Sequence, residues 1–188
     1  MIKAEKLTFG FSGSYLFQNI SFQLEENCHC ALIGSNGTGK TTLMNLIREP
    51  GSYIFDGKLT REGAGRIGYV SQFAIREGDQ SVTVYDYLCQ DFLDLEQAIG
   101  ETCMEMETAE DMDAIMERYQ ELLDESDAMD ADNHEVNIRR QLKLAELEDK
   151  ADLALENLSG GELKLVQVIR QMLRRPGLLI MKIGRAHV

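Results

Sequence analysis

The sequence predicts an α/β fold that combines a phosphate-binding core, an antiparallel β portion and an inserted acidic helical arm. Three observations predict it. Gly34–Thr42 reads GSNGTGKTT and fits the phosphate-loop pattern G-x-x-x-x-G-K-[ST]. Leu158–Glu162 reads LSGGE and precedes a basic amphipathic stretch. Residues 91–135 hold seventeen Asp or Glu and one basic residue, a net charge of −16, whereas the whole chain carries −13, so the acidity is local.

The N-terminal part of the chain reads as β-rich. Ile2–Leu7 and Leu16–Leu24 alternate apolar and polar side chains around a turn at Gly10–Ser14, which predicts two strands of an antiparallel sheet. Asp56-Gly57 lies between short strand-like runs and indicates a hairpin turn. We expect residues 66–70 to return to the sheet.

The phosphate loop has the strand-loop-helix setting that its motif needs. Cys28–Ile33 reads as a short buried strand entering the loop, and Thr41–Ile47 as an amphipathic helix leaving it. Glycines let the backbone turn its N–H groups toward a phosphate, and the helix N-terminus adds partial positive charge. The alternative is a glycine-rich loop that merely turns. The expected nucleotide-binding residues are Gly34, Ser35, Asn36, Gly37, Thr38, Gly39, Lys40, Thr41 and Thr42.

Lys40 and Thr41 have distinct expected roles in this loop. Lys40 would reach the β- and γ-phosphates of a nucleotide, and the Thr41 hydroxyl would bind Mg²⁺.

The cysteines indicate reduced thiols. Cys28, Cys30, Cys89 and Cys103 form no CxxC pair. On the predicted strand Cys28 and Cys30 share one face while His29 points to the other, so these three side chains cannot converge on one ion. We therefore expect a cytoplasmic protein without disulfides. No apolar run approaches the ~20 residues that cross a bilayer, and the N-terminus lacks a secretory signal pattern.

The acidic segment has helical periodicity. Apolar residues recur at helical spacing over 88–99 and over 112–123, with Gly100 between them as a break. We expect two amphipathic helices with charged outer faces, followed by a third helix over Val136–Ala145. The alternative, a disordered acidic segment, is disfavoured because methionine and leucine stripes are unusual in acidic tails.

The LSGGE segment predicts the start of another helix, over Glu162–Arg174. Ser159 can cap this helix, and the two glycines that follow leave N–H groups that an anion can approach. The alternative is an ordinary capped helix with no ligand.

Taken together, the phosphate loop, an isolated Gln72 about thirty residues on and the LSGGE motif resemble the ATP-binding cassette superfamily over nearly the whole chain. The resemblance implies a P-loop NTPase core of the ABC ATPase type that binds ATP and Mg²⁺. It implies that Phe11 stacks on adenine, and that Gln72 contacts Mg²⁺ and the attacking water, which makes Thr41 and Gln72 the metal-binding residues. It also implies that a signature group closes in trans over the nucleotide of a second cassette; this group is Ser159, Gly160, Gly161 and Glu162.

Within that superfamily the chain resembles the soluble ABC-F proteins. Three features carry this resemblance: the 87-position separation of Gln72 and Ser159, the Glu after the signature glycines and the RYQELL run at 118–123. The resemblance implies an ATPase with two cassettes in one chain that acts on the ribosome during translation. An arm at −16 would be repelled by an RNA backbone, which disfavours direct RNA contact by the arm. Two alternatives are the ATPase subunit of a membrane transporter and a nucleotide-dependent binding module that never hydrolyses.

The C-terminal residues depart from the family pattern. After Leu178–Met181 the family continues with the Walker B Asp, which holds Mg²⁺, and Glu, which polarises water, but Lys182 and Ile183 stand there. Residues 183–188 can be back-translated into a common sequencing adapter, so we expect 182–188 to be an artefact and the chain to be a cassette fragment that does not hydrolyse ATP. The expected organisation is 1–80 for the first part of the ATP-binding core, 81–146 for a helical subdomain with the acidic arm, 147–181 for the signature motif, helix and Walker B strand, and 182–188 for the artefact.

Overall fold

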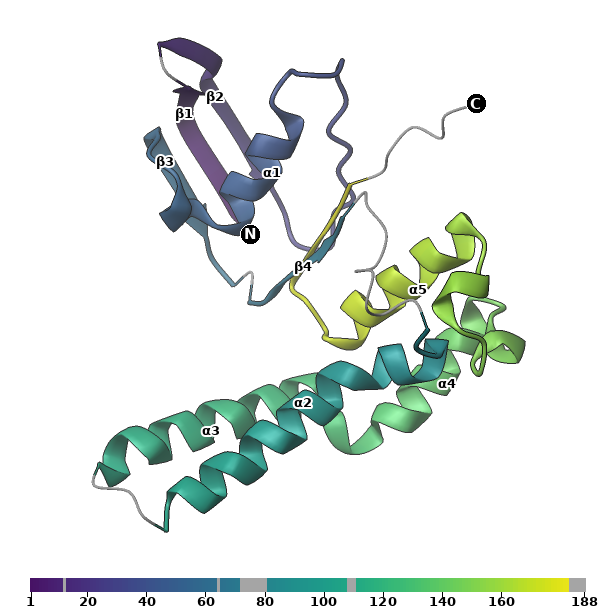
Figure 1. Ribbon diagram of the computed structural model, residues 1–188. Helices are drawn as coiled ribbons and strands as arrows, with labels where there is room; N and C mark the ends of the chain where they lie inside the picture. Colours follow the sequence, from purple (N-terminus) through teal and green to yellow (C-terminus); the bar gives the residue numbers. More distant parts are fainter. Residues whose placement is uncertain (12, 64, 72–80, 108–110, 183–188) are drawn as a thin grey trace. The chain divides into compact units, whose positions relative to one another are not determined.

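The computed structural model describes residues 1–11, 13–63, 65–71, 81–107 and 111–182. The chain divides into two compact units (Figure 1), Met1–Tyr69 with Pro176–Val188, and Val70–Arg175. Each unit is described by itself below.

An antiparallel sheet forms the base of the first unit. Its strands are β1 (Ile2–Phe11), β2 (Ser14–Leu24) and β3 (Asp56–Arg61), in the order β2-β1-β3. Strands β1 and β2 confirm the predicted antiparallel pair, but they extend into the expected turn at Gly10–Ser14, since Gly10 and Phe11 belong to β1 and Ser14 to β2. The pairing register of β1 shifts between Ala4 and Leu7, so the alternation skips a step. The bulge keeps the apolar side chains of β1 on one buried face: Ile2, Ala4, Leu7 and Phe9.

The predicted hairpin at Asp56-Gly57 is wrong. Both residues begin β3, which lies beside β1. Gly57 has a φ of +96°, and a Cβ there would lie 2.5 Å from the carbonyl oxygen of Lys6 and 2.6 Å from that of Glu5. This glycine therefore serves a close backbone approach at the bulge rather than a turn between two strands.

Helix α1 (Lys40–Arg48) covers one face of the three-stranded sheet (Figure 1). Its buried side chains Leu43, Leu46 and Ile47 join the core formed by β1. Arg61 at the end of β3 donates from Nη1 to the carbonyl oxygens of Ile47 (3.3 Å) and Arg48 (3.0 Å). The guanidinium thereby satisfies carbonyl groups that the end of a helix leaves without partners.

The predicted buried strand at Cys28–Ile33 is wrong. These residues form no strand and lie exposed, with Ile33 at 88% exposure. An apolar run becomes a strand only where a neighbour offers backbone hydrogen bonds. Strands β4 (Ile67–Val70) and β5 (Leu178–Met181) pair with each other and form a separate two-stranded sheet. Residues 66–70 thus form the expected strand, but outside the antiparallel sheet.

Four α-helices build the described part of the second unit: α2 (Val84–Glu105), α3 (Met112–Met129), α4 (His134–Leu144) and α5 (Gly160–Leu173). They confirm the helices predicted for the acidic segment and after LSGGE. One core joins them, drawn from α2, α4, α5 and the end of α3. The described residues also form short 3₁₀ turns: η1 (Pro50–Ser52), η3 (Ala131–Asn133), η4 (Glu148–Lys150) and η5 (Leu155–Asn157).

The predicted break at Gly100 is wrong, because α2 continues through this residue to Glu105. A glycine inside a helix costs only about 1 kcal/mol relative to alanine. Within α2, buried Thr102 donates to the carbonyl oxygen of Ala98 at 2.8 Å, and Arg118 of α3 pairs with Glu105, so one local contact and one contact with α3 support the helix past the glycine. Among the described residues, no helix is long and apolar enough to cross a membrane.

Candidate nucleotide-binding site

The phosphate loop at residues 34–39 is built on two glycines with positive φ. Gly37 has a φ of +83° and Gly39 a φ of +87°, and Gly39 is the residue that precedes α1. A Cβ on Gly39 would lie 2.7 Å from Cγ of Leu16 on β2. Both the backbone conformation and the packing against β2 therefore require glycine at this position.

The N-terminus of α1 has no cap from its own residues. Its first turn contains no acidic residue, and its cap residue, Gly39, has no side chain that could accept from the N–H groups. The N–H groups at a helix start have no partners within the helix and carry partial positive charge. A phosphate is the ligand that this arrangement fits, and Lys40, Thr41 and Thr42 lie partly exposed around it.

Lys40 folds back over the loop that precedes it. Its Nζ donates to the carbonyl oxygens of Gly34 at 2.9 Å and Ser35 at 2.5 Å. The Thr38 hydroxyl donates to the same Ser35 oxygen at 3.0 Å, which closes the loop into a curl around the ammonium group. The Lys40 ammonium group therefore lies against the turn that leads into α1, and the start of α1 has no side-chain cap of its own.

Phe11 lies at the end of β1 with its side chain 59% exposed. Its ring packs edge to face on Phe9, with centroids 4.9 Å apart. Phe9 contacts Phe17 of β2 (5.9 Å), and the Phe17 ring lies 3.4 Å from the Cβ position of Gly39. A line of aromatic contacts thus joins Phe11 to the phosphate loop.

An open concavity of about 310 Å³ lies beside the Phe11 ring, lined also by Tyr15 and Phe55. An exposed aromatic face next to a concavity suits stacking on a planar base.

The signature segment is a capped helix start. The Ser159 hydroxyl accepts from the backbone N–H of Glu162 (3.3 Å), and the Glu162 carboxylate accepts from the backbone N–H of Ser159 (2.8 Å). This capping box confirms the expected capping role of the serine. A Cβ on Gly160 or Gly161 would meet nothing within 4 Å, so the outer side of this turn is open.

Lys150 adds a partner that the sequence patterns do not indicate. Its ammonium group pairs with the Glu162 carboxylate. The hydrogen bond from Lys150, followed by those from Ser159, lowers the pKa of Glu162 to about 2. With both oxygens engaged, Glu162 holds the signature turn in shape, and its expected contact with the nucleotide of a second cassette stays a prediction.

Lys164 of α5 is a second residue that the sequence patterns miss. Its ammonium group donates to the carbonyl oxygen of Ser71 and to Oε1 of Gln167 (3.2 Å), and burial lowers the pKa of Lys164. No local signal indicates the Ser71 contact, because it joins residues 93 positions apart. Gln72, the expected Mg²⁺ and water contact, lies outside the described residues, as does Ile183; Lys182 is partly exposed after β5.

The structure brings the expected site residues together in two groups. Phe11 and the phosphate loop belong to the first unit, and Ser159 to Glu162 belong to the second. In the described part of the chain, no group of three or more His, Cys, Asp or Glu side chains could hold a metal ion. Thr41, Gln72 and the phosphates of a nucleotide remain the expected Mg²⁺ ligands in this chain, and the start of α1, which has no side-chain cap of its own, fits those phosphates.

Comparison with known proteins places the chain in a family. A family model described as ABC transporter matches residues 17–181, and the chain therefore belongs to this family of ATP-binding cassettes. The crystal structure of a nucleotide-free ATP-binding cassette from an ABC transporter superposes with a TM-score of 0.61 at 22% identity, over 100% of this chain and 70% of that one. The fold is that of an ABC ATPase cassette, an α/β P-loop NTPase with an antiparallel sheet.

Two relatives come from Bacillus subtilis (strain 168). The uncharacterized ABC transporter ATP-binding protein YfmM is 29% identical over 96% of this chain and 36% of its own length. The uncharacterized ABC transporter ATP-binding protein YfmR is 31% identical over 100% of this chain and 30% of its own length. The chain thus spans about a third of the length of these curated relatives.

Proposed function

We propose that this cassette binds MgATP on its phosphate loop and that the complete protein hydrolyses ATP while the cassette closes on a second one. The observation that carries the proposal is the start of α1. Its cap residue, Gly39, has no side chain, its first turn contains no acidic residue, and the Lys40 ammonium lies in the curl that precedes the helix. Membership of the ABC transporter family supports ATP as the ligand of such a loop.

Each residue of the loop has a task in this proposal. Backbone N–H groups of residues 37–41 would hold the phosphates, Lys40 would neutralise the β- and γ-phosphate oxygens, and the Thr41 hydroxyl would bind the metal. Mg²⁺ supplies charge neutralisation of the phosphate oxygens. Phe11 would hold the adenine by stacking, and Gln72 would orient the attacking water.

The signature turn is proposed to act in trans. Ser159 shapes the turn, and the open outer sides of Gly160 and Gly161 let a partner's γ-phosphate approach the helix start. Closure would bring this turn over the loop of a second cassette. The chain itself carries Lys182 and Ile183 where the resemblance puts two carboxylates, so we propose that it holds nucleotide without turnover.

The descriptions of the two relatives favour one kind of partner. YfmM and YfmR are both described as ABC transporter ATP-binding proteins. On that basis the first candidate for the complete protein is the ATPase component of a membrane transport complex.

A second candidate is an ABC-F-like protein that acts on the ribosome, and the lengths of the relatives favour it. The chain covers 70% of a single solved cassette but only 36% and 30% of the two relatives, which makes each relative about two cassettes long. Two cassettes in one chain are what the ABC-F resemblance implies. Fractionation of the complete protein in the presence of a non-hydrolysable ATP analogue separates the candidates: transport predicts recovery with membranes, and the ABC-F type predicts recovery with ribosomes.

ATP binding by the chain is tested directly by calorimetric titration with MgATP and with AMP. Because the loop holds the β- and γ-phosphates, we expect AMP to bind at least about tenfold more weakly than MgATP. Phosphate release should equal that of the Lys40→Ala variant. Equal affinity for AMP and MgATP would show that the loop does not read the phosphates and would refute the proposal.

A further inference from the structure

The arm, defined as helices α2 and α3, ends in a surface that the nucleotide site does not use. The core-facing residues of α2 lie mainly in its first half, from Val84 to Leu95. Beyond them the hairpin extends past α4 and α5 within the second unit (Figure 1). We name its far end the arm tip. It comprises the described residues 101–107 at the end of α2 and 111–119 at the start of α3.

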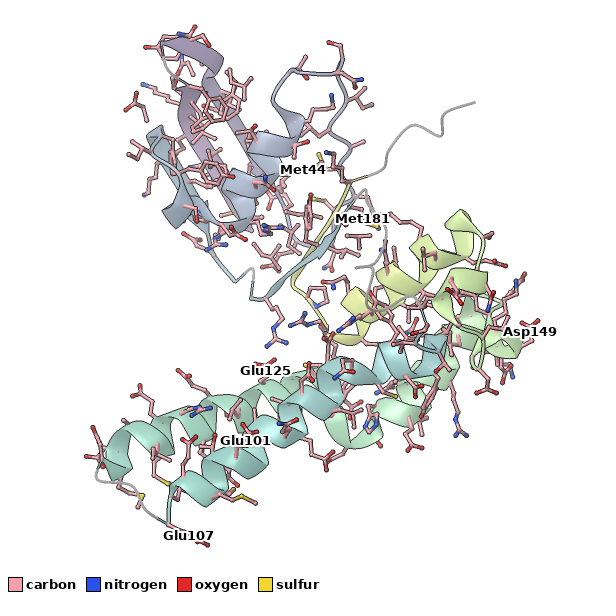
Figure 2. All side chains as sticks on the ribbon, viewed as in Figure 1. Met44, Glu101, Glu107, Glu125, Asp149 and Met181 are labelled. Carbon is pink, nitrogen blue, oxygen red and sulfur yellow. The ribbon has the colours of Figure 1, made fainter. Side chains whose placement is uncertain are left out.

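Three large apolar side chains are exposed at the arm tip. Met104 near the end of α2 is 74% exposed, and Met112 and Met116 at the start of α3 are 46% and 50% exposed. Figure 2 shows sulfur atoms gathered at the end of the hairpin that carries Glu107. Met112 and Met116 are four residues apart and share one helix face. Methionine adapts its shape to apolar partners, and apolar patches with polar rims mark protein contact sites.

Side-chain contacts join the two helix ends at the arm tip. Arg118 Nη1 pairs with Oε2 of Glu105 at 3.0 Å, and Tyr119 hydrogen-bonds Cys103, so the last turn of α2 is tied to α3. Asp111 caps α3 by accepting from the N–H of Ala114 at 3.2 Å. These contacts hold the methionines on two helix ends that lie against each other.

Charge determines which partner suits this surface. Residues 91–135 carry a net charge of −16, and their single cation, Arg118, is already paired with Glu105. Exposed acidic residues near the methionines in the chain include Glu101, Glu107, Asp113 and Glu117. Such a rim attracts cations and repels phosphate backbones. The methionines in turn need an apolar counterpart, which a purely cationic partner lacks.

We propose that the arm tip docks a basic amphipathic helical segment of a partner protein, with the three methionines contacting its apolar face and the carboxylates its Lys and Arg side chains. An amphipathic helix that binds in this way needs both the methionines and the carboxylates of the arm tip.

A defined peptide tests the docking surface on the full chain. The probe is a fluorescently labelled Leu/Lys peptide of about 15 residues with leucines on one helical face. A peptide of identical composition with the leucines scrambled around the helix is the matched control, and an oligouridylate of equal length tests RNA. Anisotropy titrations at ~0.15 M salt keep long-range attraction screened.

Substitutions at the tip separate apolar contact from charge. We expect the triple variant Met104→Gln, Met112→Gln, Met116→Gln to bind the amphipathic peptide about tenfold more weakly. Met172→Gln on α5, where Met172 is 48% exposed, is the matched control and should change nothing. Lys40→Ala should also leave peptide affinity unchanged, so the result is independent of ATP binding.

Methyl NMR signals of ¹³C-labelled methionine provide a second measurement, which follows peptide binding on the unaltered chain. Signals of the three tip methionines should shift on addition of the amphipathic peptide, whereas that of Met172 should not. Equal binding of the scrambled peptide, unchanged affinity in the triple variant, or methionine-dependent binding of oligouridylate would each overturn the proposal.

Discussion

The helix starts at Lys40 and Gly160 follow the two sequence motifs of this protein, and they differ in what surrounds their N–H groups. The start of α1 has no acidic residue and no side-chain cap, and a glycine with a φ of +87° leads into it. The start of α5 has a capping box of Ser159 and Glu162, reinforced by Lys150. The first therefore leaves its N–H groups open to an external anion, whereas the second is a turn held by its own side chains with one open side.

This difference predicts which substitutions will change ligand affinity and which will change the stability of the fold. At α1 the backbone N–H groups can bind an external anion, so substitutions in the phosphate loop should change nucleotide affinity. At α5 the side chains satisfy part of the helix start themselves, so changes there should act first on folding. Four experiments test this contrast.

Removal of the loop cation should have the largest effect. Lys40→Ala deletes a charge-assisted contact of about 1.5–3 kcal/mol, so we expect ATP to bind about ten- to a hundredfold more weakly in calorimetric titration. Lys58→Ala, which removes an exposed lysine of β3, is the control and should bind ATP like the unaltered chain. Equal ATP affinity in Lys40→Ala and the control would remove α1 from the nucleotide site.

Gly39→Ala tests whether the loop conformation itself is needed. The added Cβ would occupy a backbone with a φ of +87° and lie 2.7 Å from Leu16 Cγ. Strain of this kind costs about 1–3 kcal/mol, and both stability and ATP affinity should fall. Gly37→Ala has a similar φ but meets nothing within 4 Å, so it should lose less stability in urea unfolding. Equal losses in the two variants would show that packing on Leu16 is unimportant.

Loss of the α5 cap should lower stability without changing ATP binding. Ser159→Ala removes the hydroxyl that accepts from Glu162 N–H, at a cost of about 1 kcal/mol. Urea unfolding should show this loss, while calorimetric ATP affinity should stay that of the unaltered chain. A fall in ATP affinity without loss of stability would mean that this serine serves the same cassette's nucleotide.

Acid should weaken the α5 start through Glu162, with the smallest expected effect. The pKa of this carboxyl is lowered from 4.5 to about 2 by Lys150 and Ser159. A lowered pKa in the folded state gives stability that is present above the unfolded value and is lost as pH falls from about 4.5 toward 2. Melting temperatures between pH 6 and pH 2.5 should therefore drop more steeply for the unaltered chain than for Glu162→Gln. Parallel curves would contradict the lowered pKa.

Short-range patterns in the sequence were sufficient for most elements. Alternation identified β1 and β2, helical spacing identified α2, α3 and α4, and the serine before two glycines identified the cap of α5. These features depend on residues within a few positions of one another, so the sequence carries the physical cause directly. The phosphate loop belongs to the same class, because its glycines and the start of α1 are adjacent in the chain.

The features that the sequence misjudged depend on partners far along the chain. Whether Cys28–Ile33 forms a strand depends on a neighbouring backbone, and whether Gly57 turns or pairs depends on β1. Likewise α2 passes Gly100 because α3 packs beside it.

Pairings between distant side chains were decided by the tertiary structure alone. Arg170 of α5 donates to both carboxylate oxygens of Asp91 on α2, at 3.1 and 2.7 Å, and its guanidinium lies over the Tyr87 ring. Lys150 and Lys164 likewise find their partners only after the helices pack. The sequence by itself determined the positions of β1, β2 and the helices, the cap of α5 and the glycine-rich loop before α1, because these arise from residues close together in the chain. Strand pairing and ion pairing arise from contacts across the fold, and these exist only once the chain has packed.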